Sequence, residues 1–274
     1  PRLHTAKQAG SWMPVVDRVH SEGSKIFCQL WHCGRISHSD FTDGIQPVSS
    51  TDVAAEGINR QNGKPYGTPR RLPADEIPAV YEQFVYSAKL ALQAGFDGVE
   101  LHLGHGYLAD QFFDDRINAR DDRYGGSVEN RCRFALEATE AVLKVASENQ
   151  VIVRISPSRD YGGVFDWNEL DAMLGHLIPR FDGMGLRMLD VSCARADYFA
   201  TSGRIIAKIR AHWRHLIMGG ASLTKEQAEA EISNGHLDLV TWGRAILANP
   251  DFGIRLAKNL PLKAMEPSQL STLY

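Results

Sequence analysis

The chain has 274 residues and 43% hydrophobic content, so it can bury a large core as one α/β barrel or as two smaller domains. Its net charge of -3 gives no electrostatic case for nucleic-acid binding, and no long apolar run predicts a membrane span. The four cysteines form no C-x-x-C pair and residues 1–10 lack the apolar core of a signal peptide, so we expect a reducing, cytoplasmic location.

Apolar periodicity and helix start and stop signals predict a regular alternation of helices and strands. We expect helices at residues 5–21, 75–94, 129–148, 168–181, 203–212, 224–233 and 251–259. We expect strands at residues 25–31, 99–103, 151–156, 188–192, 216–219 and 238–242. Asp75 is expected to cap the second helix, and Thr224 with Gln227 forms a capping-box pattern at the sixth. No repeat or low-complexity linker divides residues 1–274, which we interpret as one domain.

Three segments lie outside this alternation. Residues 34–73 are rich in glycine, proline and serine and are too long for an ordinary connection, so we expect a functional loop or cap there. Residues 110–126 are dense in arginine and aspartate and are interpreted as a solvated loop. Residues 157–165 are expected to form a further loop.

Strands that alternate with helices favour a parallel sheet with helical crossovers, which defines the α/β class. A closed (β/α)8 TIM barrel has eight strands, whereas we count six. We therefore expect a TIM barrel whose first two strands lie upstream of Pro1, in a chain that is incomplete at its N-terminus and at its C-terminus. An open, doubly wound sheet is the alternative architecture.

Two histidines and a tyrosine follow the apolar run at residues 99–103. His102 and His105 lie three residues apart across a glycine-containing turn, and Tyr107 comes two residues later. In an α/β barrel the carboxyl end of a strand opens on the active-site face. Two imidazoles there can donate hydrogen bonds to one substrate oxygen, and a phenol can supply a proton. The alternative is a histidine pair that packs against a helix beside a buried tyrosine.

The last two predicted strands end in glycines. Gly219 and Gly220 end one of them, and Gly243 with Arg244 follows the other. Glycine lets backbone N–H groups approach a ligand closely, and arginine adds a charge-assisted contact with phosphate. Barrels often bind phosphate on the loops after their last two strands, so this pattern favours a phosphate site. The alternative is two helix-entry turns and a surface arginine.

Two polar residues interrupt apolar strands. Gln29 lies in the run at residues 25–31, and Arg154 lies in the run at residues 151–156. A charge in a buried strand is costly unless it is paired, so Arg154 should face an acidic partner or an anionic ligand.

Two further patterns are weak. Residues 104–109 fit the dinucleotide pattern G-x-G-x-x-A, but no neat amphipathic helix follows them. The spacing of four polar residues matches no zinc pattern, and we assign no metal to His32, Cys33, His38 and Asp40.

Several of these motifs together resemble the old yellow enzyme family of ene-reductases. The resemblance rests on residues 27–32 (FCQLWH), on residues 94–108, on residues 123–131 (RYGGSVENR) and on residues 153–156. Gly219 and Gly220, Gly243 and Arg244, and residues 249–251 complete the pattern, which runs essentially from end to end. Histidine at position 105, where the yeast members carry asparagine, resembles the plant 12-oxophytodienoate reductases and many bacterial and fungal members.

The resemblance implies an eight-stranded barrel with FMN at its carboxyl-terminal mouth. It implies that Gln29 and Arg154 contact the flavin ring, and that the phosphate is held by Gly219, Gly220, Gly243 and Arg244. His102 and His105 would hold a carbonyl or nitro oxygen of the substrate, and Tyr107 would donate the proton.

The implied activity is reduction of the C=C bond of an activated alkene, with NADPH as reductant and NADH as the alternative. Reduced FMN would deliver hydride to the β-carbon and Tyr107 a proton to the α-carbon. The expected partner is a small-molecule alkene, with a homodimer left open and no nucleic acid or membrane. Two alternatives remain: a flavin-free phosphate-binding barrel enzyme such as an isomerase, and a catalytically inactive barrel fragment.

Overall fold

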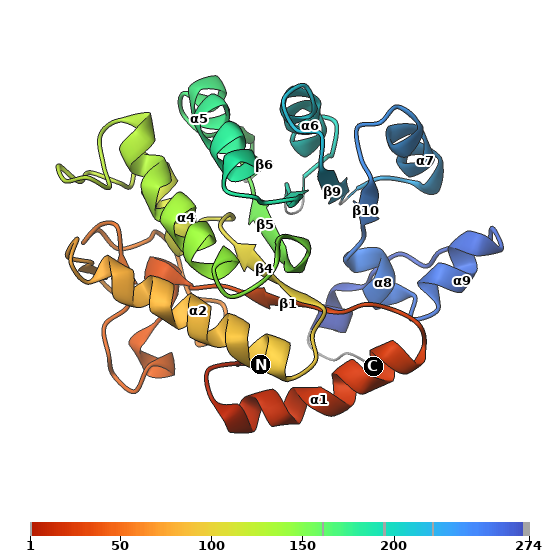
Figure 1. The fold of residues 1–274 in the computed structure, drawn as a ribbon, viewed down its shortest axis with the longest axis horizontal. Helices are drawn as coiled ribbons and strands as arrows, with labels where there is room; N and C mark the ends of the chain where they lie inside the picture. Colours follow the sequence, from red (N-terminus) through yellow and green to blue (C-terminus); the bar gives the residue numbers. More distant parts are fainter. Residues whose placement is uncertain (1, 161, 194–195, 221, 271–274) are drawn as a thin grey trace.

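Six parallel strands form a curled sheet at the centre of the protein (Figure 1). The computed structural model describes residues 2–160, 162–193, 196–220 and 222–270. The strands follow one another across the sheet in chain order: β1 Phe27–Leu30, β4 Gly98–His102, β5 Val151–Ile155, β8 Met188–Val191, β9 Leu216–Gly220 and β10 Leu239–Thr241. A doubly wound sheet reverses its strand order part-way across, so that alternative is wrong.

Helices cover the outside of the curled sheet (Figure 1). The connections between successive strands carry α2 Ile77–Gln93, α4 Val128–Leu143, α5 Leu170–Gly183, α6 Ser202–Arg210 and α7 Lys225–Ser233. α1 Ala6–Ser21 precedes β1, and α8 Arg244–Ala248 and α9 Phe252–Ala257 follow β10. Parallel strands in chain order with helices outside define an α/β barrel fold, as expected. None of the helices in the described ranges is both long and apolar enough to cross a membrane.

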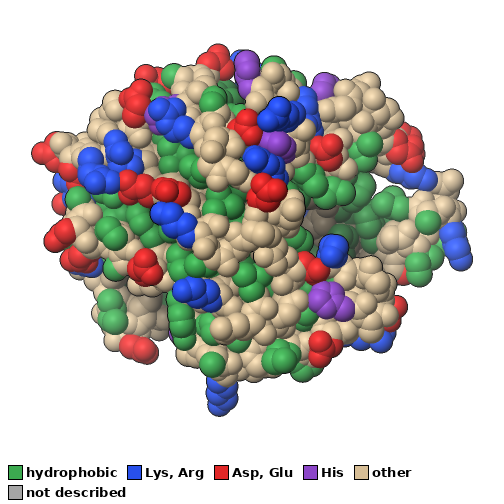
Figure 2. Space-filling view, in the orientation of Figure 1, with side chains coloured by type: hydrophobic (Ala, Val, Ile, Leu, Met, Phe, Trp, Pro, Cys, Tyr) green, Lys and Arg blue, Asp and Glu red, His purple; other side chains and the backbone are tan. Residues whose placement is uncertain are grey.

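Side-chain alternation along the strands divides the sheet into two faces. Val99 and Leu101 of β4 are fully buried in the apolar core that the helices share. Glu100 and His102 alternate with them and therefore point to the opposite face. The inner face of the barrel is thus polar near the carboxyl end of β4. On the outer surface in this view, acidic and basic side chains are interspersed (Figure 2).

The predicted strands are confirmed to within two residues at each end, and the capping box of Thr224 and Gln227 is present. The predicted Asp75 cap is wrong: Glu76 occupies the N-cap of α2 and makes no side-chain cap bond. The helix expected at 129–148 ends at Leu143, and a separate 3-10 turn forms at Glu148–Gln150. The short helix α8 was not anticipated.

Residues 110–126 are not simply a solvated loop. They begin inside the six-residue helix α3 (Leu108–Phe113), and Asp110, Asn118 and Arg120 are buried. The Asn118 amide donates to the backbone carbonyls of Phe112 and Tyr124, each at 2.7 Å. Local composition predicted exposure, but these polar groups bury because the fold supplies partners for them.

The two other irregular segments contain small strands. The segment at 157–165 forms most of an antiparallel hairpin of β6 Ser158–Asp160 and β7 Val164–Asp166. Residues 34–73 contain two 3-10 turns, at Gly34–Ile36 and Ser39–Phe41. They also contain a short parallel pair of β2 Val48–Ser49 and β3 Arg70–Arg71.

The capping box at α7 generates a stability prediction. The Thr224 hydroxyl accepts from the Gln227 N–H at 3.3 Å, and the Gln227 side chain accepts from the Thr224 N–H at 2.9 Å. Thr224→Ala should lower the free energy of unfolding by about 1 kcal/mol, because one helix N–H loses its partner. Urea denaturation should show a lower midpoint at an unchanged slope. Thr224→Ser keeps the hydroxyl and is the control; equal losses in both variants would contradict the role of the cap.

Candidate active site

The turn that follows β4 lies directly on the end of β5. Gly104 is buried, and a Cβ added there would come within 2.5 Å of Ser156 Oγ and 2.8 Å of Ser156 N. The next residue, His105, donates its backbone N–H to the same Ser156 Oγ at 2.5 Å. Position 104 therefore requires glycine, because any side chain would separate the two strand ends. This contact places the residues after β4 at the carboxyl edge of the sheet.

The two histidines of the motif touch one another. His102 Nε2 and His105 Nδ1 lie 3.2 Å apart. Burial, together with the positive charge of Arg154, lowers the pKa of His102 to about 3. Burial, together with His102, Arg154 and Arg159, lowers the pKa of His105 to about 2. Both imidazoles are therefore neutral at physiological pH.

Neutral imidazoles limit what the pair can donate. Each ring carries one N–H, so one proton lies between His102 Nε2 and His105 Nδ1. The outer atoms, His102 Nδ1 and His105 Nε2, are buried and have no hydrogen-bond partner among the described residues. In this arrangement one of them carries the second proton and the other is bare. Two N–H donors aimed at one oxygen, as the sequence suggested, therefore require the contact between the rings to open.

The Tyr107 ring lies against the ring of His102. Tyr107 occupies the N-cap of α3, and its ring centroid lies 5.3 Å from that of His102 and 4.4 Å from that of Trp31. Trp31 follows β1, which pairs with β4. The structure thus brings His102, His105 and Tyr107 together, as the sequence predicted, and adds Trp31 beside them.

Arg154 and Gln29 share an acidic partner that sequence reasoning missed. Arg154 lies beside His102 in the register of β4 and β5, and its Nη1 is 3.9 Å from Glu100 Oε2. Its Nε is 3.3 Å from Asp190 Oδ2, and its Nη2 donates to Ser192 Oγ at 2.8 Å. Gln29 donates its amide N–H to Glu100 Oε2.

Buried charges surround the Arg154 guanidinium. Burial raises the pKa of Asp190, and neighbouring Glu100 raises it further, while Arg154 opposes the shift. The signal for both acids was present in the sequence, because Glu100 and Asp190 interrupt apolar strands as Arg154 does. The expectation that Arg154 faces an acidic partner is confirmed.

The glycines proposed for phosphate binding differ in what they require. A Cβ on Gly220, where φ is +156°, would meet the Thr241 carbonyl oxygen at 2.3 Å, and one on Gly219 would meet Ile206 Cδ1 at 2.8 Å. Close packing of Gly220 against β10 and of Gly219 against α6 therefore accounts for both glycines. A Cβ on Gly243 would meet nothing within 4 Å, so no protein contact requires glycine there. An exposed Arg244 follows and forms no ion pair within the described part of the chain.

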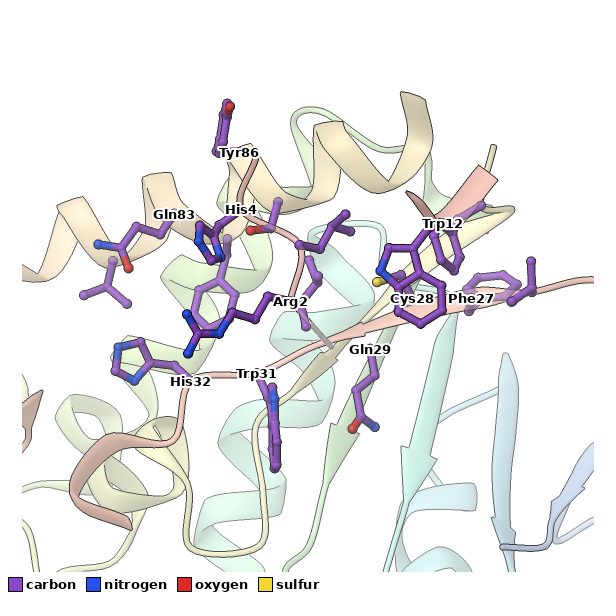
Figure 3. A pocket seen from close by; sticks show the side chains of 17 residues that line it. Arg2, His4, Trp12, Phe27, Cys28, Gln29, Trp31, His32, Gln83 and Tyr86 are labelled. Carbon is purple, nitrogen blue, oxygen red and sulfur yellow. The ribbon is translucent and has the colours of Figure 1, made fainter. Parts of the chain in front are cut away.

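Two cavities in the described part of the chain include candidate site residues in their lining. One, of about 890 Å³, runs along the outer edge of β1 between α1 and α2. Figure 3 shows Gln29 and Trp31 extending from β1 on the side away from Tyr86 of α2. A second cavity, of about 580 Å³, is lined by His105, Arg159 and the β6–β7 hairpin. The smaller cavity has the stronger claim as a substrate site, because a polar catalytic candidate lines it.

The geometry describes a barrel with imidazole, phenol and guanidinium groups at the carboxyl edge of its strands. Residues 1–263 match the NADH:flavin oxidoreductase / NADH oxidase family. The chain belongs to this family, and the resemblance to old yellow enzymes is confirmed.

Several relatives of this chain are named as 12-oxophytodienoate reductases. Putative 12-oxophytodienoate reductase 11 from Oryza sativa subsp. japonica is 38% identical over 268 residues, which cover 96% of this chain and 73% of the relative. 12-oxophytodienoate reductase 2 from Arabidopsis thaliana is 36% identical over 282 residues, which cover 99% and 74%.

Solved structures of old yellow enzyme type also match this chain. The old yellow enzyme homologue from Zymomonas mobilis matches with a TM-score of 0.89 and 30% identity, over 100% of this chain and 80% of its own. Morphinone reductase in complex with tetrahydroNAD matches with a TM-score of 0.87 and 34% identity, over 98% of this chain and 75% of its own. The protein is thus an oxidoreductase of the old yellow enzyme type.

The neutral histidine pair generates a pH prediction. Because the folded-state pKa values lie below the ordinary 6.5, the unfolded chain binds more protons as pH falls through 6.5, and folding stability is lost. Each ring should contribute roughly 2–3 kcal/mol of this loss between pH 7 and 4.5. Urea unfolding should therefore depend less on pH in the His102→Asn/His105→Asn variant than in the wild type. Identical pH profiles would contradict the buried, neutral pair.

Proposed function

We propose that this protein is an FMN-dependent ene-reductase that uses NAD(P)H to reduce the C=C bond of α,β-unsaturated carbonyl or nitro compounds. The observation that carries the proposal is the buried pair His102 and His105, whose outer nitrogens have no partner among the described residues, beside Tyr107. Unpaired buried nitrogens are costly, which supports a role for them in contacting a ligand.

The residues present suit FMN. Gly243 leaves open space beside its backbone, and Arg244 adds an exposed cation, which suits a phosphate. Arg154 is held by Asp190 and Glu100 with 29% of its side chain exposed, so it can also face an anionic ring edge. We assign Gln29 and Arg154 to the flavin ring, and Gly219, Gly220, Gly243 and Arg244 to the phosphate. When bound, FMN supplies the hydride that adds to the β-carbon of the alkene.

His102 and His105 act on the substrate oxygen. Hydride addition leaves negative charge on the carbonyl or nitro oxygen, and preorganised donors in a buried site stabilise charge as it develops. The pair presents one N–H as it stands. A substrate oxygen that separates the two rings gains a second donor. Both imidazoles remain neutral, so they polarise the oxygen without transferring a proton to it.

Tyr107 completes the reaction as general acid. A phenol is protonated at neutral pH and can give its proton to the α-carbon. The T-shaped contact with Trp31 and the ring contact with His102 hold the phenol ring beside the imidazoles. We expect NADPH as the reductant, with NADH as the alternative, and a cytoplasmic location. The relative that binds tetrahydroNAD, morphinone reductase, supports a nicotinamide nucleotide.

The first test concerns flavin binding and the role of the Tyr107 phenol as proton donor. Purified protein should show the visible absorption of bound flavin and should oxidise NAD(P)H in the presence of an activated alkene. Tyr107→Phe removes only a hydroxyl, so alkene reduction should slow by roughly 10²- to 10⁴-fold while flavin reduction keeps its rate. Stopped-flow measurement of each half-reaction separates the two steps, with Tyr86→Phe, an exposed tyrosine of α2, as the control.

Two outcomes would contradict this function. Equal slowing of both half-reactions in Tyr107→Phe would remove the proton-donor assignment. A wild-type protein that never acquires flavin would instead be a flavin-free phosphate-binding barrel, such as an isomerase, or an inactive barrel.

Arg154 offers a second test, with a matched control at the opposite end of the sheet. Arg187, which precedes β8, also has 29% of its side chain exposed and also pairs with two acids, Asp182 at 3.3 Å and Glu148 at 3.5 Å. Each Arg→Met variant should lose stability, because its acids lose a cation. Only Arg154→Met should bind FMN roughly 10- to 100-fold more weakly, since a charged hydrogen bond is lost. FMN titration of the apoprotein measures this; equal affinities in both variants would make Arg154 a structural ion pair.

A further inference from the structure

Two polar residues are buried in the first turn of the helix after the catalytic motif. Asp110 and Gln111 of α3 are 1% and 0% exposed. Short helices seldom bury adjacent polar side chains, because each buried donor or acceptor needs a partner. In this protein both residues find partners on the backbone between His105 and Tyr107.

Asp110 and Gln111 bind both backbone polar groups of Gly106, its N–H and its carbonyl oxygen. The Gly106 N–H donates to Asp110 Oδ2 at 2.6 Å, and Gln111 Nε2 donates to the Gly106 carbonyl oxygen at 2.8 Å. His105 and Gly106 both have left-handed backbones, with φ of +57° and +79°. Such a conformation is unfavourable for a histidine and persists only where its surroundings hold it. The two hydrogen bonds are such a restraint.

Asp110 also joins this turn to the β6–β7 hairpin. Its Oδ2 pairs with Arg159 of β6, and its Oδ1 accepts from Trp167 Nε1 at 2.9 Å. Burial raises the pKa of Asp110, while Arg159, Gly106 and Trp167 oppose the shift. Three N–H donors, from Gly106, Arg159 and Trp167, face the two carboxyl oxygens, and this arrangement favours the carboxylate over the acid.

We propose that Asp110 is a positioning residue, which holds Gly106 so that the flanking His105 and Tyr107 side chains stay in their places at the active site. Gln111 assists from the carbonyl side of Gly106, and Arg159 links the same carboxylate to the hairpin that lines the smaller cavity. The inference rests on the proposed function for its effect on alkene reduction.

A purely structural ion pair would explain the burial of Asp110 and Arg159 but not a specific effect on His105. The two roles differ in one bond, the Gly106 N–H to the carboxylate. Arg159→Met keeps that bond and leaves a buried carboxylate without its cation. Asp110→Leu/Arg159→Met removes both charges together with the acceptor for Gly106. Removing one partner of a buried pair destabilises more than replacing both by apolar side chains.

The proposal therefore predicts opposite rankings for stability and catalysis. Asp110→Leu/Arg159→Met should be the more stable variant in urea, yet it should reduce an activated alkene such as 2-cyclohexenone at least tenfold more slowly than Arg159→Met. Arg204→Met is the control. Arg204 of α6 holds the same hairpin through Asp166 and Ser158 and has no contact with Gly106.

Nitrogen-15 NMR of the labelled histidine rings gives a readout that needs neither cofactor nor substrate. The signals that report the contact of His102 Nε2 with His105 Nδ1 should change in Asp110→Leu/Arg159→Met and persist in Arg159→Met and in Arg204→Met. The proposal would be overturned if the more stable variant, Asp110→Leu/Arg159→Met, also reduced the alkene faster and kept the ring signals better than Arg159→Met. A wild type without ene-reductase activity would defeat the proposed function alone, because the ring spectra would still decide the role of Asp110.

Discussion

The close approach of the ends of β4 and β5 is the contact on which the candidate site depends. Gly104 has no side chain, so Ser156 can lie against it and accept the His105 N–H. The pairing of the two strands continues past His102, since the Leu103 N–H donates to the Arg154 carbonyl oxygen at 2.8 Å. A larger residue at position 104 would move the histidine turn away from β5 and from Arg154.

The same close packing determines the protonation of the site. Burial disfavours the charged form of each imidazole, so both are neutral, and a neutral pair in contact presents one free N–H instead of two. The neighbouring strands bring three ionisable groups into the barrel: Glu100, Arg154 and Asp190. Burial is tolerable there because the Arg154 guanidinium lies within 4 Å of both acids. Substitution of any of the three should therefore change the electrostatic environment of the other two and of His102.

Hydrogen bonds from two elements hold the turn at residues 104–107. Ser156 of the sheet accepts the N–H of His105, and Asp110 and Gln111 of α3 bind the next residue, Gly106. Gln111 also accepts from Ser49 Oγ at 2.8 Å, so the long segment at residues 34–73 packs against the same helix. The segment and the β6–β7 hairpin therefore both contact α3. This arrangement makes the short helix the common support of the site.

The sequence alone determined those features that depend on neighbouring residues. Strand positions follow from apolar runs, the capping box at Thr224 from two residues three apart, and the group of His102, His105 and Tyr107 from one strand end. The pairing of Arg154 with Glu100 and Asp190, the burial of Asp110 and the single free N–H of the histidine pair could not be predicted in this way. Each depends on side chains that come from different strands or on a contact distance, and a linear pattern contains neither. Only the tertiary structure decides them, because it sets which side chains meet and how deeply each is buried.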